Sequence, residues 1–260
     1  MTSPYERHIR LTGAHNVRDL GGYATVTGGT TRWRSFLRAD ALHDLTADDV
    51  EALLTLGLRT VIDLRSDAEI ARQPSAFAGH ETVRYHHIPL FDDLAPVDAM
   101  MLEKDSFDLS SRYVDAADRC RPAIARVAAT IATAGTGVVL FNCTAGKDRT
   151  GIVAAMLLSL AGVDSEKIAA DYALTASIAG TLMEKLKTHA MARGLDEFVS
   201  SRLLSSEPAA MLTFLRHMED HYGGFQNYLA DGTAETDIVH LIEKRILAEQ
   251  LMSQPVVNNS

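Results

Sequence analysis

The sequence predicts an α/β fold, with a central, mainly parallel β-sheet flanked by helices and a helix-rich C-terminal half. Three observations predict it. Short apolar, β-branched runs alternate with helical patterns up to Leu160, as is typical of parallel strands joined by helices. After Asp164 the pattern is helical in several pieces, with breaks at Gly194, Pro208 and Gly223. The chain has 260 residues, 47% of them hydrophobic, which suffices for one large core and a possible helical lid.

In the first half of the chain, we expect three strands and one helix. Thr46-Ala47-Asp48-Asp49 resembles a capping box with Asp in place of Glu, so a helix begins there, and Gly57 ends it. The runs that predict strands are residues 35–38, 59–64 and 83–90.

Further along, a helical pattern covers residues 111–134, with a break expected near Pro122 because proline interrupts helical hydrogen bonding. Residues 137–142 are an apolar, β-branched run and predict a buried strand. Residues 150–160 are apolar nearly all round and predict a buried helix. A buried strand followed at once by a buried helix is a common position for a ligand site in α/β proteins.

Composition excludes several classes of function. The net charge of −9 argues against nucleic acid or anionic membrane as a charge-driven partner, so an anionic substrate needs a local basic pocket. Two cysteines are too few for a disulfide scaffold. No signal peptide or long apolar span is visible, so we expect a cytoplasmic protein without stable membrane insertion, unconventional secretion staying open. We expect residues 1–252 to form a single domain and residues 253–260 a disordered tail. The sequence does not indicate an oligomeric state.

The segment from Phe141 to Gly151 carries the chemistry. Five residues separate Cys143 from Arg149, enough to wrap the backbone into a cradle whose N–H groups point at a phosphoryl group. The helix that follows presents its positive end to the same point, which also favours the thiolate of Cys143. Arg149 offers a planar fork for two phosphate oxygens, and Thr150 a hydroxyl for the sulfur.

Two other interpretations of this segment are weaker. A buried cysteine in a turn, with Arg149 as a surface charge, would not require this spacing. A nucleotide-binding Walker loop needs Ser or Thr after its lysine, and Asp148 follows Lys147 here. Phe141 also stands where the first glycine of such a loop belongs.

The run Cys-Thr-Ala-Gly-Lys-Asp-Arg-Thr-Gly at 143–151 resembles the bacterial atypical tyrosine/serine phosphatases, a dual-specificity, phosphoinositide-capable family of the protein tyrosine phosphatase superfamily. Other segments resemble motifs of the family more weakly and occur in the family's order along the chain. They are residues 16–22, 62–65 with Glu69, 87–90 and 221–229. The resemblance implies a protein tyrosine phosphatase-like fold and a two-step reaction through a phosphocysteine, without metal or cofactor. The implied substrate is a phosphorylated protein or a phosphoinositide.

The resemblance also implies roles for individual residues. The catalytic set is Cys143, Arg149 and Asp148; the substrate-binding set is Thr144, Ala145, Gly146, Lys147 and Thr150; the supporting set is Asn142, Asp63 and Arg65. Asp92 and Asp93 are rivals of Asp148 as general acid. Lys147 either recognises a second phosphate or is solvated or ion-paired.

One residue departs from the family pattern. Asn142 stands where the family commonly has His, so we expect a less activated thiol or a differently held loop. A phosphate-binding pseudophosphatase with little turnover is therefore an alternative function. Sulfur transfer and arsenate reduction also use cysteine loops, but the Gly-Lys-Asp-Arg-Thr-Gly run fits them poorly.

Overall fold

The computed structural model describes residues 5–92, 94, 108–192, 194–232 and 237–248. Its centre is a five-stranded sheet of order β1-β2-β5-β3-β4. The strands are β1 (Arg18–Asp19), β2 (Phe36–Ala39), β3 (Leu58–Asp63), β4 (Arg84–His87) and β5 (Val138–Asn142). Only β1 runs antiparallel to its neighbour, so the predicted α/β fold with a mainly parallel sheet is confirmed.

The helices are α1 (Ala47–Thr55), α2 (Asp67–Arg72), α4 (Leu109–Arg119), α5 (Arg121–Ala132), α6 (Asp148–Leu160), α7 (Ser165–Ile178), α8 (Gly180–Ala192), α9 (Glu197–Leu204), α10 (Pro208–Tyr222), α11 (Gly224–Gly232) and α12 (Asp237–Ile246). The expected break near Pro122 is present, because α4 ends at Arg119 and Pro122 lies in the first turn of α5. The capping box at Thr46 and Asp49 is also present. Strand β4 is shorter than the predicted run of residues 83–90.

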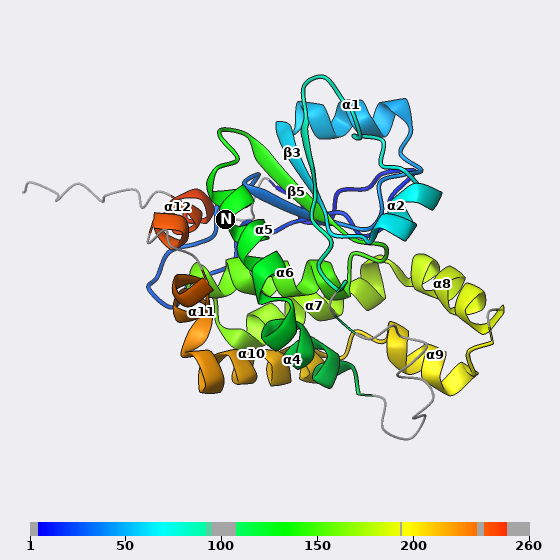
Figure 1. The fold of residues 1–260 in the computed structure, drawn as a ribbon. Coiled ribbons are helices and arrows are strands. Elements are labelled where there is room, and N and C mark those ends of the chain that lie inside the picture. The colour runs from blue at the N-terminus through cyan, green and yellow to red at the C-terminus, as the bar shows by residue number, and fades with distance from the viewer. Residues whose placement is uncertain (1–4, 93, 95–107, 193, 233–236, 249–260) are drawn as a thin grey trace, which may run out of the picture.

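Helices cover both faces of the sheet (Figure 1). On one face, Phe36, Val139 and Phe141 pack into a large core with α4 to α7 and α10 to α12. On the other face, Leu37, Leu140 and their neighbours pack against α1 and the N-terminal segment. Because both faces are buried at the centre of the sheet, most of β5 and half of β3 are apolar, which explains why these two strands were visible as buried runs in the sequence. The edge strands β1 and β4 are more polar.

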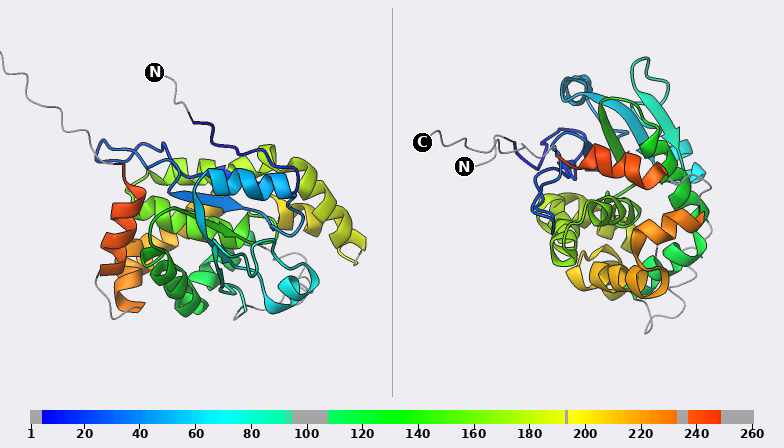
Figure 2. Two further views of the ribbon diagram at one scale, coloured as in Figure 1. Left: turned by 90° about the horizontal axis from the view of Figure 1, so that it is seen from above. Right: turned by 90° about the vertical axis from the view of Figure 1, so that its left-hand side faces the viewer.

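The C-terminal half forms two groups of helices. Figure 2 shows α12 beside the N-terminal segments, where Arg32 N–H donates to the Ile246 carbonyl at 2.6 Å. Helices α8 and α9 pack against each other and project from the body of the protein (Figure 1). In the described residues, no helix combines the length and the apolar character needed to cross a bilayer. The expected tail, residues 253–260, lies outside the described residues.

Candidate active site

The predicted cysteine loop lies where the carboxyl end of β5 meets the amino end of α6. Cys143 directly follows β5, and Arg149 is in the first turn of α6. The Cys143 side chain is almost fully buried. A buried helix start next to a thiol gives an electropositive site at which an anion is favoured.

The outer side of the loop is fully hydrogen-bonded. The carbonyl oxygens of residues 144–147 all accept hydrogen bonds. Their donors are, in order, Ala41 N (3.2 Å), Asn16 Nδ2 (2.8 Å), Arg38 Nη2 (2.9 Å) and Gly151 N (2.7 Å). A trans peptide holds its C=O and N–H on opposite sides, so each anchored carbonyl turns the next N–H the other way. The outer bonds therefore shape an inner row of N–H groups.

The inner side of the loop presents backbone N–H donors that have no acceptor in the described chain. Within the described residues, the N–H groups of residues 145–147 have no hydrogen-bond acceptor. Consecutive backbone N–H groups that converge in this way form an anion-binding concavity. Unpaired N–H groups are costly when buried, so their arrangement here indicates that a ligand completes them.

At position 146 the loop can accept only glycine. Its φ is +65°, in the left-handed region that glycine adopts without strain. A Cβ at this position would lie 2.6 Å from Asp40 N and 2.7 Å from Ala39 C, both backbone atoms. Glycine thus lets the loop pack directly against the end of β2.

A buried ion cluster holds the two side-chain donors of the outer side, Asn16 and Arg38. The Asp171 carboxylate on α7 receives Arg38 Nη1 at 2.6 Å and Arg18 Nε at 3.2 Å, and all three side chains are buried. Tyr23 Oη donates to the same carboxylate at 2.7 Å, and Arg18 also donates to Asn16 Oδ1. Burial opposes ionisation of Asp171, but the two arginines outweigh it and lower its pKa. The cluster therefore stays charged and keeps Arg38 and Asn16 aimed at the loop.

Arg149 is held by Glu69 of α2. Arg149 Nη1 and Nη2 donate to the two Glu69 carboxylate oxygens at 2.6 and 2.8 Å, a bidentate pair. Thr144 Oγ1 also donates to Glu69. Burial opposes ionisation of Glu69, but Arg149 lowers its pKa to about 2. The pKa of Arg149 is raised: burial lowers it, while the hydrogen bonds to Glu69 and the electrostatic interaction with Cys143 raise it more.

Asp148 lies at the start of α6 with a partly exposed carboxylate. Its Oδ1 accepts from Tyr113 Oη at 2.5 Å and lies 3.1 Å from Lys147 Nζ. Tyr113 Oη is also 2.7 Å from Tyr172 Oη. Burial raises the pKa of Tyr113 well above its ordinary value, so Tyr113 remains a donor to Asp148. The carboxylate is thus fixed in direction while part of it faces solvent.

Lys147 points away from solvent. Its side chain is fully buried, and Nζ donates to the carbonyl oxygens of Leu203 and Ser205, each at 2.7 Å. Both carbonyls belong to the end of α9, so Lys147 links this helix to the loop. Ala145 packs against Met183 of α8 in a small apolar cluster, so both projecting helices contact the loop.

The remaining sequence-predicted residues fall into two groups. Asp63 and Arg65 pair with each other, Nη2 to Oδ2 at 2.7 Å, and Tyr85 Oη donates to Asp63 at 3.0 Å. Asn142 and Thr150 are fully buried at the loop. Neither the amide of Asn142 nor the hydroxyl of Thr150 has a hydrogen-bond partner in the described part of the chain.

The rival acids can be placed only in part. Asp92 is exposed in the turn after β4, and Asp93 lies outside the described residues. Phe91 precedes Asp92, and its ring lies 5.9 Å from the Arg149 guanidinium and 5.1 Å from that of Arg112. Asp92 is therefore adjacent to a residue at the mouth of the site.

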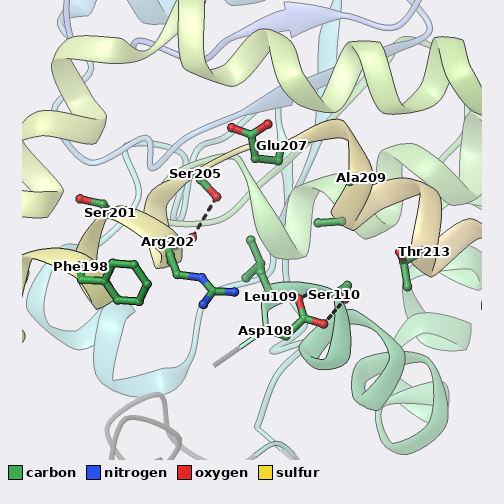
Figure 3. A pocket seen from close by; sticks show the side chains of 11 residues that line it. Asp108, Leu109, Ser110, Phe198, Ser201, Arg202, Ser205, Glu207, Ala209 and Thr213 are labelled. Atoms are coloured by element: carbon green, nitrogen blue, oxygen red, sulfur yellow. Dashed lines mark hydrogen bonds between the residues drawn. The ribbon is translucent and has the colours of Figure 1, made fainter. Parts of the chain in front are cut away.

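Two cavities lie near the loop. The one in Figure 3, about 480 Å³, is formed by the start of α4 with α9 and α10, and no residue of the cysteine loop lines it. A smaller cavity of about 210 Å³ reaches the loop at Thr144 and is lined in part by His15, His43 and His189. Among the described residues, no group of three or more His, Cys, Asp or Glu side chains converges to hold a metal ion.

Sequence reasoning missed several residues of this site. Glu69 was noted only within a motif, although Ser66-Asp67-Ala68-Glu69 is a capping box that predicts its helix start. Arg38, Asp171 and Tyr113 carry no local signal. They are distant in the sequence and meet the loop only in the folded chain.

The comparisons with known proteins agree with this geometry. A family model described as the tyrosine phosphatase family matches residues 9–248. A relative from Cupriavidus necator named as a tyrosine-protein phosphatase is 31% identical over 236 residues, 87% of this chain and 84% of its own. The triple specificity protein phosphatase PtpB of Mycobacterium tuberculosis is 29% identical, over 85% of this chain and 92% of its own.

Two further similarities are more limited. A tyrosine-protein phosphatase of Nostoc commune is 38% identical over 142 residues, 55% of this chain and 48% of its own. The solved structure of TpbA from P. aeruginosa, in complex with pTyr, is 21% identical with a TM-score of 0.34. That match covers 54% of this chain and 70% of TpbA.

Proposed function

Since the chain belongs to the tyrosine phosphatase family and is an enzyme of the protein-tyrosine-phosphatase type, we propose that it hydrolyses phosphate monoesters through a phosphocysteine at Cys143. One observation carries this proposal: the loop carbonyls are bonded outward while the N–H groups of residues 145–147 have no acceptor in the described chain. Such a row of donors beside a thiol and an arginine fits the three equatorial oxygens of a transferring phosphoryl group.

In the first step, the Cys143 thiolate attacks phosphorus, and the bond from phosphorus to the leaving oxygen breaks. The N–H groups of the loop and the Arg149 fork stabilise the charge on the equatorial oxygens. Glu69 keeps that fork in place, because its bidentate pair with Arg149 fixes the guanidinium plane.

Asp148 supplies the proton that the leaving oxygen takes. Tyr113 and Lys147 both contact Oδ1, so among the described residues Oδ2 is the oxygen without a partner. In the second step, a water oxygen attacks phosphorus, the phosphorus–sulfur bond breaks, and Asp148 receives the proton of that water. Inorganic phosphate leaves, and the thiolate is restored.

The identity of the acid is open to a direct test. We expect Asp148→Asn to lower kcat by about 10²-fold or more on phosphopeptides and to remove the basic limb of the pH–rate profile. Asp92→Asn is the matched control and should keep both. If instead Asp92→Asn removes the limb and Asp148→Asn does not, Asp92 is the acid.

For the substrate, we propose phosphorylated proteins first and phosphoinositides second. The name of the M. tuberculosis relative, a triple specificity protein phosphatase, supports a broad range of phosphorylated residues. Lys147 contributes its N–H to the cradle, while its ammonium positions Asp148 and the end of α9. A second phosphate would have to displace those contacts to reach Lys147.

The decisive experiment measures phosphate release from para-nitrophenyl phosphate between pH 5 and 8, with chelator, for wild type, Cys143→Ser and Cys120→Ser. We expect activity in wild type and in Cys120→Ser, which changes the buried cysteine outside the loop, and a loss of about 10⁴-fold or more in Cys143→Ser. Phosphopeptide and phosphoinositide panels then rank substrates.

Asn142 supports a second candidate, a phosphate-binding protein with little turnover. Its buried amide has no partner in the described chain, so it does not hold the loop as a hydrogen-bonded side chain would. Folded, reduced wild type that binds phosphopeptide without releasing phosphate would establish this candidate. Restored turnover in Asn142→His would then identify Asn142 as the cause.

A further inference from the structure

A cavity of about 700 Å³ lies at the end of the sheet opposite the cysteine loop. Ser35, which precedes β2, and Gly137, which precedes β5, line it, whereas Cys143 follows the other end of β5. At about 3.3 Å per residue, the strand separates the two places by roughly 15 to 20 Å. The cavity is therefore distinct from the candidate active site.

The charged residues that line this cavity are all cationic. They are Arg32, Arg34, Lys244 and Arg245, and no Asp or Glu is among the lining residues. Arg84 lies beside them, because its Nη2 donates to the Ala134 carbonyl next to the lining loop. Such a concentration is unexpected on a chain of net charge −9. Arg38 and Arg149, by contrast, each pair with an acid.

Arg245 has no acidic partner among the described residues. Its guanidinium donates to the carbonyl oxygens of Gly135 and Gly137, the latter at 3.1 Å, which fixes it in the cavity wall. Burial lowers the pKa of Arg245, and the charges of Arg32 and Arg84 lower it further. The partial negative charge at the end of α12 compensates Lys244 and Arg245 in part, but not Arg32, which belongs to another segment.

Arg34 supplies an independent observation. It is the one non-glycine residue with positive φ, +56°, in the part of the chain that the structure describes. A residue other than Gly or Asn in this region costs of order 1 kcal/mol, and such strain concentrates at functional positions. Here the strained position adds an arginine to the rim of a cationic cavity.

We propose that this cavity is a second, non-catalytic anion site that binds a small molecule carrying two or more clustered phosphate groups. Its volume falls in the range of small-molecule sites. Several arginines can engage phosphate oxygens in bidentate pairs, and more than one phosphate is needed to compensate four cations. A soluble metabolite or a lipid headgroup could present the same phosphates.

The chain contains a local reporter for this site. Trp33 is the single tryptophan, and it lies between two lining residues, Arg32 and Arg34. Its ring stacks on Tyr5 at 5.4 Å, so a shift of either neighbour changes its surroundings. Tripolyphosphate is titrated into wild type, Arg32→Glu, Lys244→Glu and Lys167→Glu. Binding is measured by Trp33 fluorescence and by calorimetry. Lys167 is an exposed cation on α7 outside the cavity and is the matched control.

We expect saturable binding that weakens about tenfold or more in Arg32→Glu and Lys244→Glu and is unchanged in Lys167→Glu. It should persist in Arg149→Met, which removes the catalytic fork. Hydrolysis of para-nitrophenyl phosphate should stay within twofold of wild type in the three charge reversals. Vesicles of phosphatidylcholine with a phosphoinositide bisphosphate, tested on the same variants, show whether a lipid headgroup is also accepted.

Three results would overturn the proposal. The first is binding that Arg149→Met abolishes, since tripolyphosphate would then occupy the catalytic cradle alone. The second is an equal effect of all three charge reversals, and the third is no binding by calorimetry in wild type. In either of these two cases the cavity would have no specific affinity for phosphates.

Discussion

The two sides of the cysteine loop differ in how completely they are bonded. On the outer side, every carbonyl oxygen of residues 144–147 has a donor, and a buried ion cluster around Asp171 holds the two side-chain donors, Asn16 and Arg38. On the inner side, the N–H groups of residues 145–147 have no partner within the described residues. The difference teaches that the fold supports one side so that the other can stay available to a ligand.

This contrast separates stability from chemistry. Changes on the outer side should act mainly on the free energy of unfolding, and changes on the inner side mainly on kcat/KM. Glu69 connects the two, because it belongs to α2 but fixes the orientation of Arg149.

The largest effect is expected on the inner side. Arg149→Lys keeps the charge but loses the planar fork, so kcat/KM should fall about 10³-fold, while the midpoint of urea unfolding changes little. Steady-state kinetics and urea titration check both parts. Arg216→Lys, an exposed substitution on α10, is the control. A loss below tenfold would mean that the fork does not hold the transferring group.

On the outer side, Asp171→Ala leaves Arg18 and Arg38 buried without their acid. Removing one partner of a buried ion cluster costs about 3 to 5 kcal/mol, so the free energy of unfolding should fall by that amount in urea titrations. Glu166→Ala, an exposed change on the same helix, should cost far less. Equal losses of unfolding free energy in the two variants would show that the Asp171 cluster does not stabilise the outer side of the loop.

Glu69→Gln tests the connection between the two sides. Because the pKa of Glu69 is lowered to about 2, its ionisation stabilises the fold above the unfolded value near 4.5, and this contribution is lost as pH falls through about 2. Wild type should exceed Glu69→Gln by about 2 to 3 kcal/mol at pH 6 to 8, with the gap closing between pH 4.5 and 2. A gap that does not change with pH would show that the Glu69 carboxylate contributes through packing alone.

The smallest effect concerns Asn142. Replacing a buried amide that lacks partners with an apolar side chain of similar size, Asn142→Leu, should raise the free energy of unfolding by about 1 kcal/mol. Differential scanning calorimetry of wild type, Asn142→Leu and Asn142→His measures it. A lower stability of Asn142→Leu would show that the amide finds a partner in solution.

The sequence predicted those features that depend on residues close together along the chain. Apolar runs predicted four of the five strands, and the break at Pro122 and the cap at Thr46 follow from short-range rules. The spacing from Cys143 to Arg149 predicted a cradle, because one loop contains it. The two-residue strand β1 was missed, since so short a segment has no periodicity.

What the sequence did not reveal depends on where distant segments meet. Asp171 lies in a helix whose pattern contains nothing unusual, and its role arises from Arg18 and Arg38 on the sheet side. The direction of the Lys147 side chain was likewise undecided, because the carbonyls that it binds belong to α9. Charge and spacing identify a candidate residue, but only packing sets its partner.

The outer bonds of the loop also have a consequence for how the chain folds. Asn16 and Ala145 are 129 positions apart, Arg38 and Gly146 are 108 apart, and Arg38 and Asp171 are 133 apart. Contacts of such sequence separation form slowly, because the chain loses the entropy of closing a large loop before the contact stabilises it. The cradle cannot take its shape before the N-terminal segment, β2 and α7 have assembled. We therefore expect the recovery of enzymatic activity in refolding to follow the slowest phase. A nascent chain that ends before α7 contains Cys143 but lacks the contacts that shape the loop.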